Sequence, residues 1–95
     1  MNSFHLDNDN VRLRFINYEQ RSDDEEYAEI MSILKSAGCL IGRVCMAPDC
    51  DYINCRIKQY SFTVIHTIDG DGSFIYCDNQ LGMKELEKIF PLIKK

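Results

Sequence analysis

Apolar residues recur at helical spacing between Ser22 and Gly38, and this pattern is the clearest structural signal in the chain. The recurring positions are Tyr27, Ile30, Met31, Leu34 and Ala37. Such spacing is typical of the buried face of an amphipathic helix. Ser22 and Glu25 have the spacing of a capping box, and Gly38 suits the position just past a helix end. We therefore predict a helix over residues 23–37.

Alternation of apolar and polar residues predicts strands in most of the remaining chain, because a strand with one buried face has a period of two. The expected strands cover residues 4–7, 11–18, 40–46, 51–58, 60–68 and 73–77. A second helix is expected over residues 81–90, after the capping pair Asp78 and Asn79, and Pro91 should end it.

The resulting order of elements is β-β-α-β-β-β-β-α. Strands joined by short turns pair in an antiparallel way, and two helices can cover one face of the sheet. The predicted fold class is therefore α+β, with an antiparallel sheet of about five to six strands and two helices on one face. The length of 95 residues indicates a single domain spanning residues 1–95.

The turn at residues 47–50, which contains Pro48, sets a testable register for the strands on either side. With Met46 opposite Asp51, the pairs Val44 and Ile53, Gly42 and Cys55, and Leu40 and Ile57 follow. This register puts Leu40 on the core face and Ile41 on the other face. A slip by one residue would exchange the two faces.

A second hairpin is predicted at residues 69–72, whose sequence Asp-Gly-Asp-Gly tolerates positive φ. An even-numbered loop places Ile75 and Cys77 on the core face. A three-residue loop with a bulge places Phe74 and Tyr76 there instead. The sequence leaves both alternatives open.

The formal charge of −4 is unevenly distributed, because six acidic residues and one basic residue lie between Glu19 and Glu29. These acids can cap the helix and interact with its dipole. They can also form a docking surface that attracts a basic protein. The candidate partner-binding residues are Glu19, Asp23, Asp24, Glu26 and Glu29.

Arginine and tyrosine side chains gather on the other predicted face of the sheet. These side chains are Arg12, Arg14, Arg43, Tyr52 and Arg56. Arginine beside exposed tyrosine can bind phosphate and stack on bases, so a nucleic-acid interface is the first alternative function. The net negative charge argues against it. Alternatively, these arginines pair across strands with acids such as Asp51, and the face then has a purely structural role.

Five cysteines, an odd number, indicate reduced thiols. Cys45, Cys50 and Cys55 are spaced too evenly for the paired ligands of a zinc site, and we expect no metal or cofactor. A second alternative function is a small thiol enzyme in which His66 activates Cys77. A two-residue loop would place these two residues opposite each other.

These observations favour a protein-binding module without enzymatic activity. A bacterial immunity protein or antitoxin that blocks a basic toxin or nuclease is the most concrete hypothesis, since such inhibitors use charge to speed association. No apolar run reaches the roughly 20 residues of a membrane-spanning helix. Residues 1–10 lack the features of an export signal, so we expect a cytoplasmic protein. The sequence does not indicate the oligomeric state.

Overall fold

The computed structural model describes residues 1–16, 22–67 and 72–93. In chain order the elements are β1 (Ser3–Phe4), β2 (Arg12–Phe15), α1 (Asp23–Ser36), β3 (Leu40–Met46), β4 (Cys50–Ile57), β5 (Tyr60–Thr67), β6 (Ser73–Tyr76) and α2 (Gln80–Ile89). The predicted order is confirmed, with most boundaries within two residues. The exceptions are the first two strands, which are shorter in the described part of the chain.

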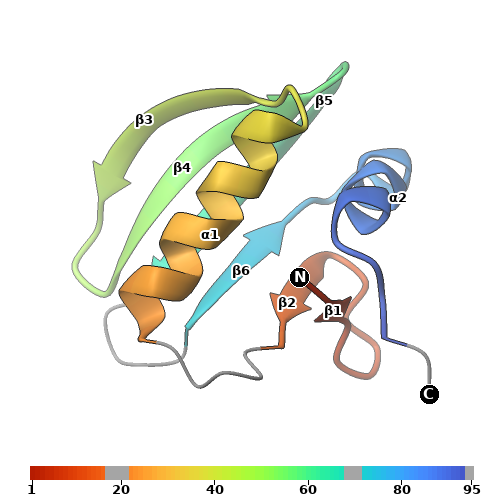
Figure 1. The fold of residues 1–95 in the computed structure, drawn as a ribbon, viewed down its shortest axis with the longest axis horizontal. Coiled ribbons are helices and arrows are strands. Elements are labelled where there is room, and N and C mark those ends of the chain that lie inside the picture. Colours follow the sequence, from red (N-terminus) through yellow and green to blue (C-terminus); the bar gives the residue numbers. More distant parts are fainter. Residues whose placement is uncertain (17–21, 68–71, 94–95) are drawn as a thin grey trace.

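One antiparallel sheet holds all six strands in the order β1-β2-β6-β5-β4-β3. In Figure 1, α1 lies across the sheet and α2 lies near the ends of β5 and β6. Side chains from both helices share one hydrophobic core with the sheet, so both helices lie on the same face. The predicted α+β class is therefore confirmed.

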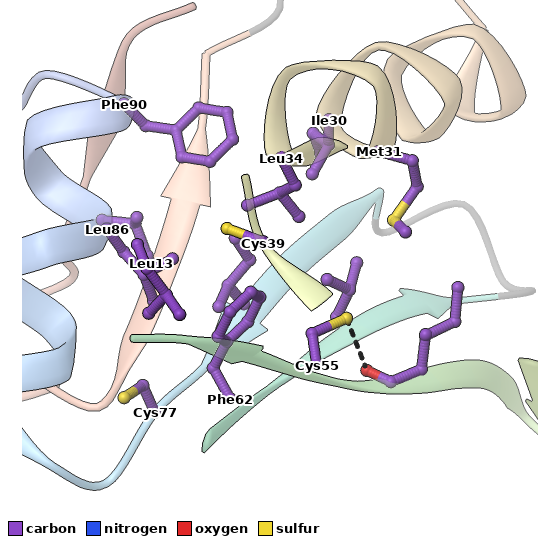
Figure 2. Close-up of a cluster of buried hydrophobic side chains, with 14 of the residues drawn as sticks. Leu13, Ile30, Met31, Leu34, Cys39, Cys55, Phe62, Cys77, Leu86 and Phe90 are labelled. Carbon is purple, nitrogen blue, oxygen red and sulfur yellow. Dashed lines mark hydrogen bonds between the residues drawn. The ribbon is translucent and has the colours of Figure 1, made fainter. Parts of the chain in front are cut away.

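Helix α1 begins and ends as its sequence predicts. The Ser22 hydroxyl accepts a hydrogen bond from the Glu25 N–H, and Ala37 is the C-cap residue. Gly38 follows with φ of +86°, a conformation that costs glycine little. Ile30 and Leu34 are fully buried, and Figure 2 shows them in the same interior as Phe62 of β5 and Phe90 at the end of α2.

Helix α2 is capped at its start and packs against the sheet at its end. The Asn79 side chain caps its first turn by accepting from the Leu81 and Gly82 N–H groups. At the other end, the rings of Phe90 and Phe15 meet edge to face with centroids 4.9 Å apart. Aromatic pairs of this geometry stabilise a core beyond their buried area.

The register between β3 and β4 confirms only half of the prediction. Met46 lies opposite Asp51 and Val44 opposite Ile53, as expected, but Ile41 then lies opposite Cys55. A β-bulge accounts for the change, because two residues of β3, Gly42 and Arg43, oppose the single residue Asn54 of β4.

The bulge exchanges the two faces of β3 at its start. Ile41 packs against the core, whereas Leu40 lies opposite Arg56 and is 68% exposed. The prediction that Leu40 faces the core and Ile41 faces away was therefore wrong. An extra residue in one strand shifts every later side chain to the other face.

The β5–β6 hairpin follows the even-numbered alternative. Thr67 donates its N–H to the Gly72 carbonyl oxygen, and the four residues between them lie outside the described part. Ile75 and Cys77 are buried, while Phe74 and Tyr76 lie on the opposite face of the sheet and are partly exposed.

Candidate functional site

The sheet face turned away from α1 and α2 is covered by no helix in the described part of the chain, and we call it the open face. The strand registers align six side chains on it, one from each strand, and we call this set the cross-strand row. The row runs Phe4, Arg14, Phe74, Ile65, Tyr52 and Cys45. Each side chain in it is partly exposed. Three aromatic rings, one arginine, one isoleucine and one cysteine thus form a continuous row across the sheet.

Two arginines of β2 stack on aromatic rings of β6 on the open face. The Arg12 guanidinium carbon lies 5.6 Å from the centre of the Tyr76 ring. The Arg14 guanidinium carbon lies 5.1 Å from the centre of the Phe74 ring. Both distances fit cation–π attraction, and both pairs are direct cross-strand neighbours. Stacking therefore orders the two guanidinium groups on an otherwise flat surface.

The open face is cationic because of how charge is distributed over the strands. The six strands carry four arginines and one acidic residue, Asp51. Asp51 lies opposite His66 on the helix side, so the predicted pairing of this acid with the arginines does not occur. The Arg12 guanidinium lies 3.4 Å from the Asp9 carboxylate.

Arg14 differs from Arg12 in having no ion pair among the described residues. Its Nε is buried and has no hydrogen-bond partner there. An unsatisfied buried donor carries a desolvation cost.

The structure places the arginine and tyrosine residues predicted from the sequence as follows. Arg12, Arg14, Tyr52 and Arg56 lie on the open face, because their strand neighbours Leu13, Ile53 and Cys55 are buried on the other face. Arg43 lies in the β-bulge at the sheet edge and is exposed. Four of the five candidates are therefore brought onto one surface.

Sequence reasoning did not name Phe4, Ile65 and Phe74 as candidate residues, although they complete the cross-strand row. The signal that could have found Phe74 is its alternation with Ile75. That signal needed the loop length, which the sequence left open. Phe4 required the pairing of β1 with β2, which no local pattern specifies.

The acidic candidates at the start of α1 do not form one exposed surface. Asp24 is 94% exposed, but Glu26 is only 6% exposed. One oxygen of Glu26 accepts a hydrogen bond from the Ser73 N–H, 3.2 Å away. Glu29 is partly buried, Asp23 is the first residue of α1, and Glu19 lies outside the described residues. The candidate Glu26 is therefore buried inside the protein and is not part of an exposed docking surface.

His66 connects the start of α1 to the β5–β6 hairpin. Its Nδ1 lies 3.0 Å from the Ser73 hydroxyl and its Nε2 lies 3.2 Å from the Asp24 carboxylate. The Tyr27 ring stacks on the imidazole with centroids 4.6 Å apart. Burial, followed by the nearby Asp51 carboxylate, raises the pKa of Tyr27.

This Ser-His-Asp line does not have the geometry of a hydrolase. In such enzymes the serine is accessible and the acid is buried, whereas here Ser73 is buried and Asp24 is exposed. The three groups instead hold the first turn of α1 against the sheet. The contacts of Glu26 and Ser73 have the same effect.

The contact between His66 and Cys77 on which the thiol-enzyme alternative depends does not occur. His66 lies opposite Ser73, and the β5–β6 pairing ends at Thr63 and Tyr76. Cys77 is buried and its sulfur lies within hydrogen-bonding distance of the Ser61 and Asn79 carbonyl oxygens. Burial raises the pKa of the Cys77 thiol. A thiol without a nearby base and with a raised pKa is a poor nucleophile.

The cysteines considered for zinc lie on different faces. Cys45 and Cys50 are partly exposed, and Cys55 is buried on the helix side of β4. No cluster of three potential metal ligands occurs among the described residues.

We predict that thiol-alkylating reagents distinguish two classes of cysteine in the native protein. Cys45 and Cys50 should react first. Burial raises the pKa of Cys39, Cys55 and Cys77, so their reactive thiolate fraction is smaller, and we expect reaction slower by more than about tenfold. Mass spectrometry after brief labelling measures the order, and full labelling in denaturant is the control. Early modification of Cys77 would contradict the assignment.

Comparison with known protein families, curated proteins and solved structures finds no match to this chain. No described helix is both long and apolar enough to cross a membrane. The function is therefore inferred from the open face itself.

Proposed function

We propose that this chain is a protein-binding module that docks through the open face of its sheet. The observation that carries the proposal is the cross-strand row, which crosses all six strands and contains three aromatic side chains and one arginine. Tyrosine, phenylalanine and arginine are enriched in protein interfaces, and tyrosine and arginine are enriched among the residues that dominate binding energy.

Charge favours a partner that brings carboxylates to this face. The expectation of a basic partner depended on the acids of α1, but Glu26 is occupied inside the protein and Glu29 is partly buried. On the open face, Arg14 and Arg56 have no acid to pair with among the described residues. Arginine binds carboxylates in a bidentate way, so a docking partner with acidic and aromatic groups complements them.

A bacterial immunity protein or antitoxin remains the concrete form of this proposal. Such an inhibitor acts in the cytoplasm by occluding a toxin and needs no catalytic group of its own. A rigid sheet suits that task, because an ordered surface loses little conformational entropy on binding. The exposed Arg56 on the open face would then help to steer association with the carboxylates of the partner.

We predict that reversing charge on the open face weakens the partner complex. The partner is first captured from native lysate, identified by mass spectrometry and purified. Arg14→Glu should then lower affinity by about tenfold or more, as expected for a central interface arginine. Lys84→Glu is the matched control, because it makes the same charge change on an exposed position of α2. Isothermal titration calorimetry measures both affinities.

Two results would contradict the proposal. One is equal loss of affinity for Arg14→Glu and Lys84→Glu, which would indicate a general charge effect. The other is an unchanged affinity for both Arg14→Glu and Tyr52→Ala, which would place the docking surface elsewhere. Thermal melting of each variant separates lost binding from lost folding.

Single-stranded nucleic acid is the second candidate, favoured by the arginine–aromatic stacks of the open face. Bases can stack on aromatic rings and on guanidinium planes. Against it, the chain carries a net charge of −4, and its own arginines already cover two of the rings. We expect no complex with short RNA or DNA near an ionic strength of about 0.15 M. A micromolar, salt-sensitive complex weakened by Arg56→Ala and Arg43→Ala would favour this candidate instead.

A further inference from the structure

The two edges of the sheet are treated differently by the fold. At the β1 edge, the Ser3 N–H donates to the Pro91 carbonyl oxygen, and the Ser3 carbonyl oxygen accepts from the Ile93 N–H. The segment 91–93 therefore covers this edge. At the other edge, β3 has no further strand beside it in the described part of the chain, as Figure 1 shows.

The bare edge also carries exposed apolar side chains. Leu40, Val44 and Met46 are 68%, 57% and 85% exposed, respectively. Val44 borders a groove of about 560 Å³ between β3 and α1, which is also lined by Tyr27 and Met31. An exposed edge strand with apolar side chains is a template for pairing with another strand.

The hydrogen-bond pattern identifies the free backbone groups of this edge. The Ala47 N–H donates to the Cys50 carbonyl oxygen, so residues 47 and 50 are a hydrogen-bonded pair. Such pairs alternate with non-hydrogen-bonded pairs along an antiparallel ladder. The backbone N–H and C=O groups of Cys45 therefore face β4. Those of Val44 and Met46 face away from β4, towards the open edge of the sheet.

We propose that β3 pairs antiparallel with β3 of a second copy of this chain, with Val44 opposite the partner's Met46. This register uses both outward-pointing residues of each copy and forms four backbone hydrogen bonds around a two-fold axis. The interface is isologous, so it closes on a dimer and does not propagate into fibres. The proposal goes beyond the docking function and does not depend on what the open face binds.

The other two symmetric registers are excluded by the strand itself. Pairing Val44 with the partner's Val44 would need backbone bonds from Gly42, which lies in the β-bulge. Pairing Met46 with the partner's Met46 would place Val44 opposite the partner's Pro48, which has no N–H to donate. Of these three registers, only the proposed one needs no backbone bond from the bulge and none from Pro48.

Side chains complement each other in the proposed register. Val44 and the partner's Met46 lie on the helix side, next to the α1–β3 groove, where both become covered. The exposed Arg43 comes opposite the partner's Ala47, which is followed by the turn that carries the partner's exposed Asp49. Opposite charges that come close to each other attract. Apolar contact and charge thus both favour a second copy as the occupant of this edge.

The two-fold axis passes through Cys45, which lies opposite the partner's Cys45 in a non-hydrogen-bonded pair. Cα atoms in such pairs are about 4.5 Å apart, within the range of a disulfide. Cys45 is also the last member of the cross-strand row. The dimer would therefore join two rows into one continuous row across two sheets.

The dimer should be weak and depend on concentration. Only three residues of each strand pair, so the interface is smaller than the roughly 800 Å² per partner of a stable complex. We expect monomers at low micromolar concentration and dimers as concentration approaches the order of 1 mM. Sedimentation equilibrium measures the association constant under reducing conditions.

Two variants separate the β3 edge from general surface hydrophobicity. Met46→Lys places a charge on the edge and should weaken dimerisation by about tenfold or more. Leu81→Lys is the matched control, because Leu81 is 59% exposed on α2, and it should leave dimerisation unchanged. Equal effects of the two variants would overturn the proposal, as would a chain that stays monomeric at the highest concentration.

Cross-linking tests the register. Diamide accepts two electrons and two protons when two thiols form a disulfide, and it should link wild-type dimers through Cys45. The covalent dimer should persist in Cys50→Ser and disappear in Cys45→Ser. Both cysteines are partly exposed, so both variants should fold. A cross-link that requires Cys50 would overturn the proposed register, and absence of any covalent dimer in a dimerising wild type would do the same.

Discussion

Replacing Leu34 by alanine is expected to lower the free energy of unfolding by about 2–4 kcal/mol. Leu34 is fully buried on the inner side of α1, among the side chains that Figure 2 shows between the helix and the sheet. Truncation removes apolar contact and leaves a cavity that a packed core closes only in part. Denaturant melts of wild type and variant measure the difference.

Leu40→Ala is the matched control for this prediction, because it removes the same atoms from a position that is 68% exposed. Surface substitutions change stability by about 0.5 kcal/mol or less. The pair also tests the β-bulge, since the register without a bulge puts Leu40 in the core. A large cost for Leu40→Ala, or one below about 0.5 kcal/mol for Leu34→Ala, would contradict the layer assignment.

Gly42→Ala is expected to destabilise the protein by about 1–3 kcal/mol through overpacking. A Cβ atom at Gly42 would overlap the backbone oxygen of Asn54. Backbone cannot move aside as a flexible side chain can, so β3 would have to shift away from β4. Denaturant melts give the total cost, and amide hydrogen exchange should show faster opening of the β3–β4 pairs.

Gly38→Ala separates steric overlap from backbone strain. Gly38 has a φ of +86°, but no atom lies within 4 Å of the position that a Cβ would take. Alanine there should cost about 1–2 kcal/mol through strain alone. Exchange in β3 and β4 should then change only with global stability. The same result for Gly42→Ala, with exchange of the β3–β4 amides changing only with global stability, would disprove the close approach at the bulge.

The two proposals use different parts of one surface. Docking depends on the side chains of the open face, above all Arg14 and Tyr52, whereas the dimer depends on the edge of β3. Met46→Lys should therefore impair dimerisation and leave docking of a single copy intact. Arg14→Glu should have the opposite effect. The failure of one proposal can thus be recognised without affecting the other.

The sequence by itself determined the elements and their order. Local signals are sufficient for this, because a capping serine, a helical stripe and alternating strand positions act through neighbours within a few residues. The bounds of β3 were predicted to the residue, and four arginine or tyrosine candidates were placed correctly on one face. Those four alternate with buried neighbours inside single strands, so no distant contact was needed to place them.

Tertiary structure alone decided how these elements meet. The pairing of β2 with β6 joins segments some sixty residues apart, and it creates the arginine–aromatic stacks and most of the cross-strand row. The same is true of Glu26, which looks like a solvated acid in a polar run but is buried against Ser73. The bulge at Gly42 depends on close backbone approach to Asn54. Each feature depends on contacts between distant segments, and these form only when the whole sheet closes around its core.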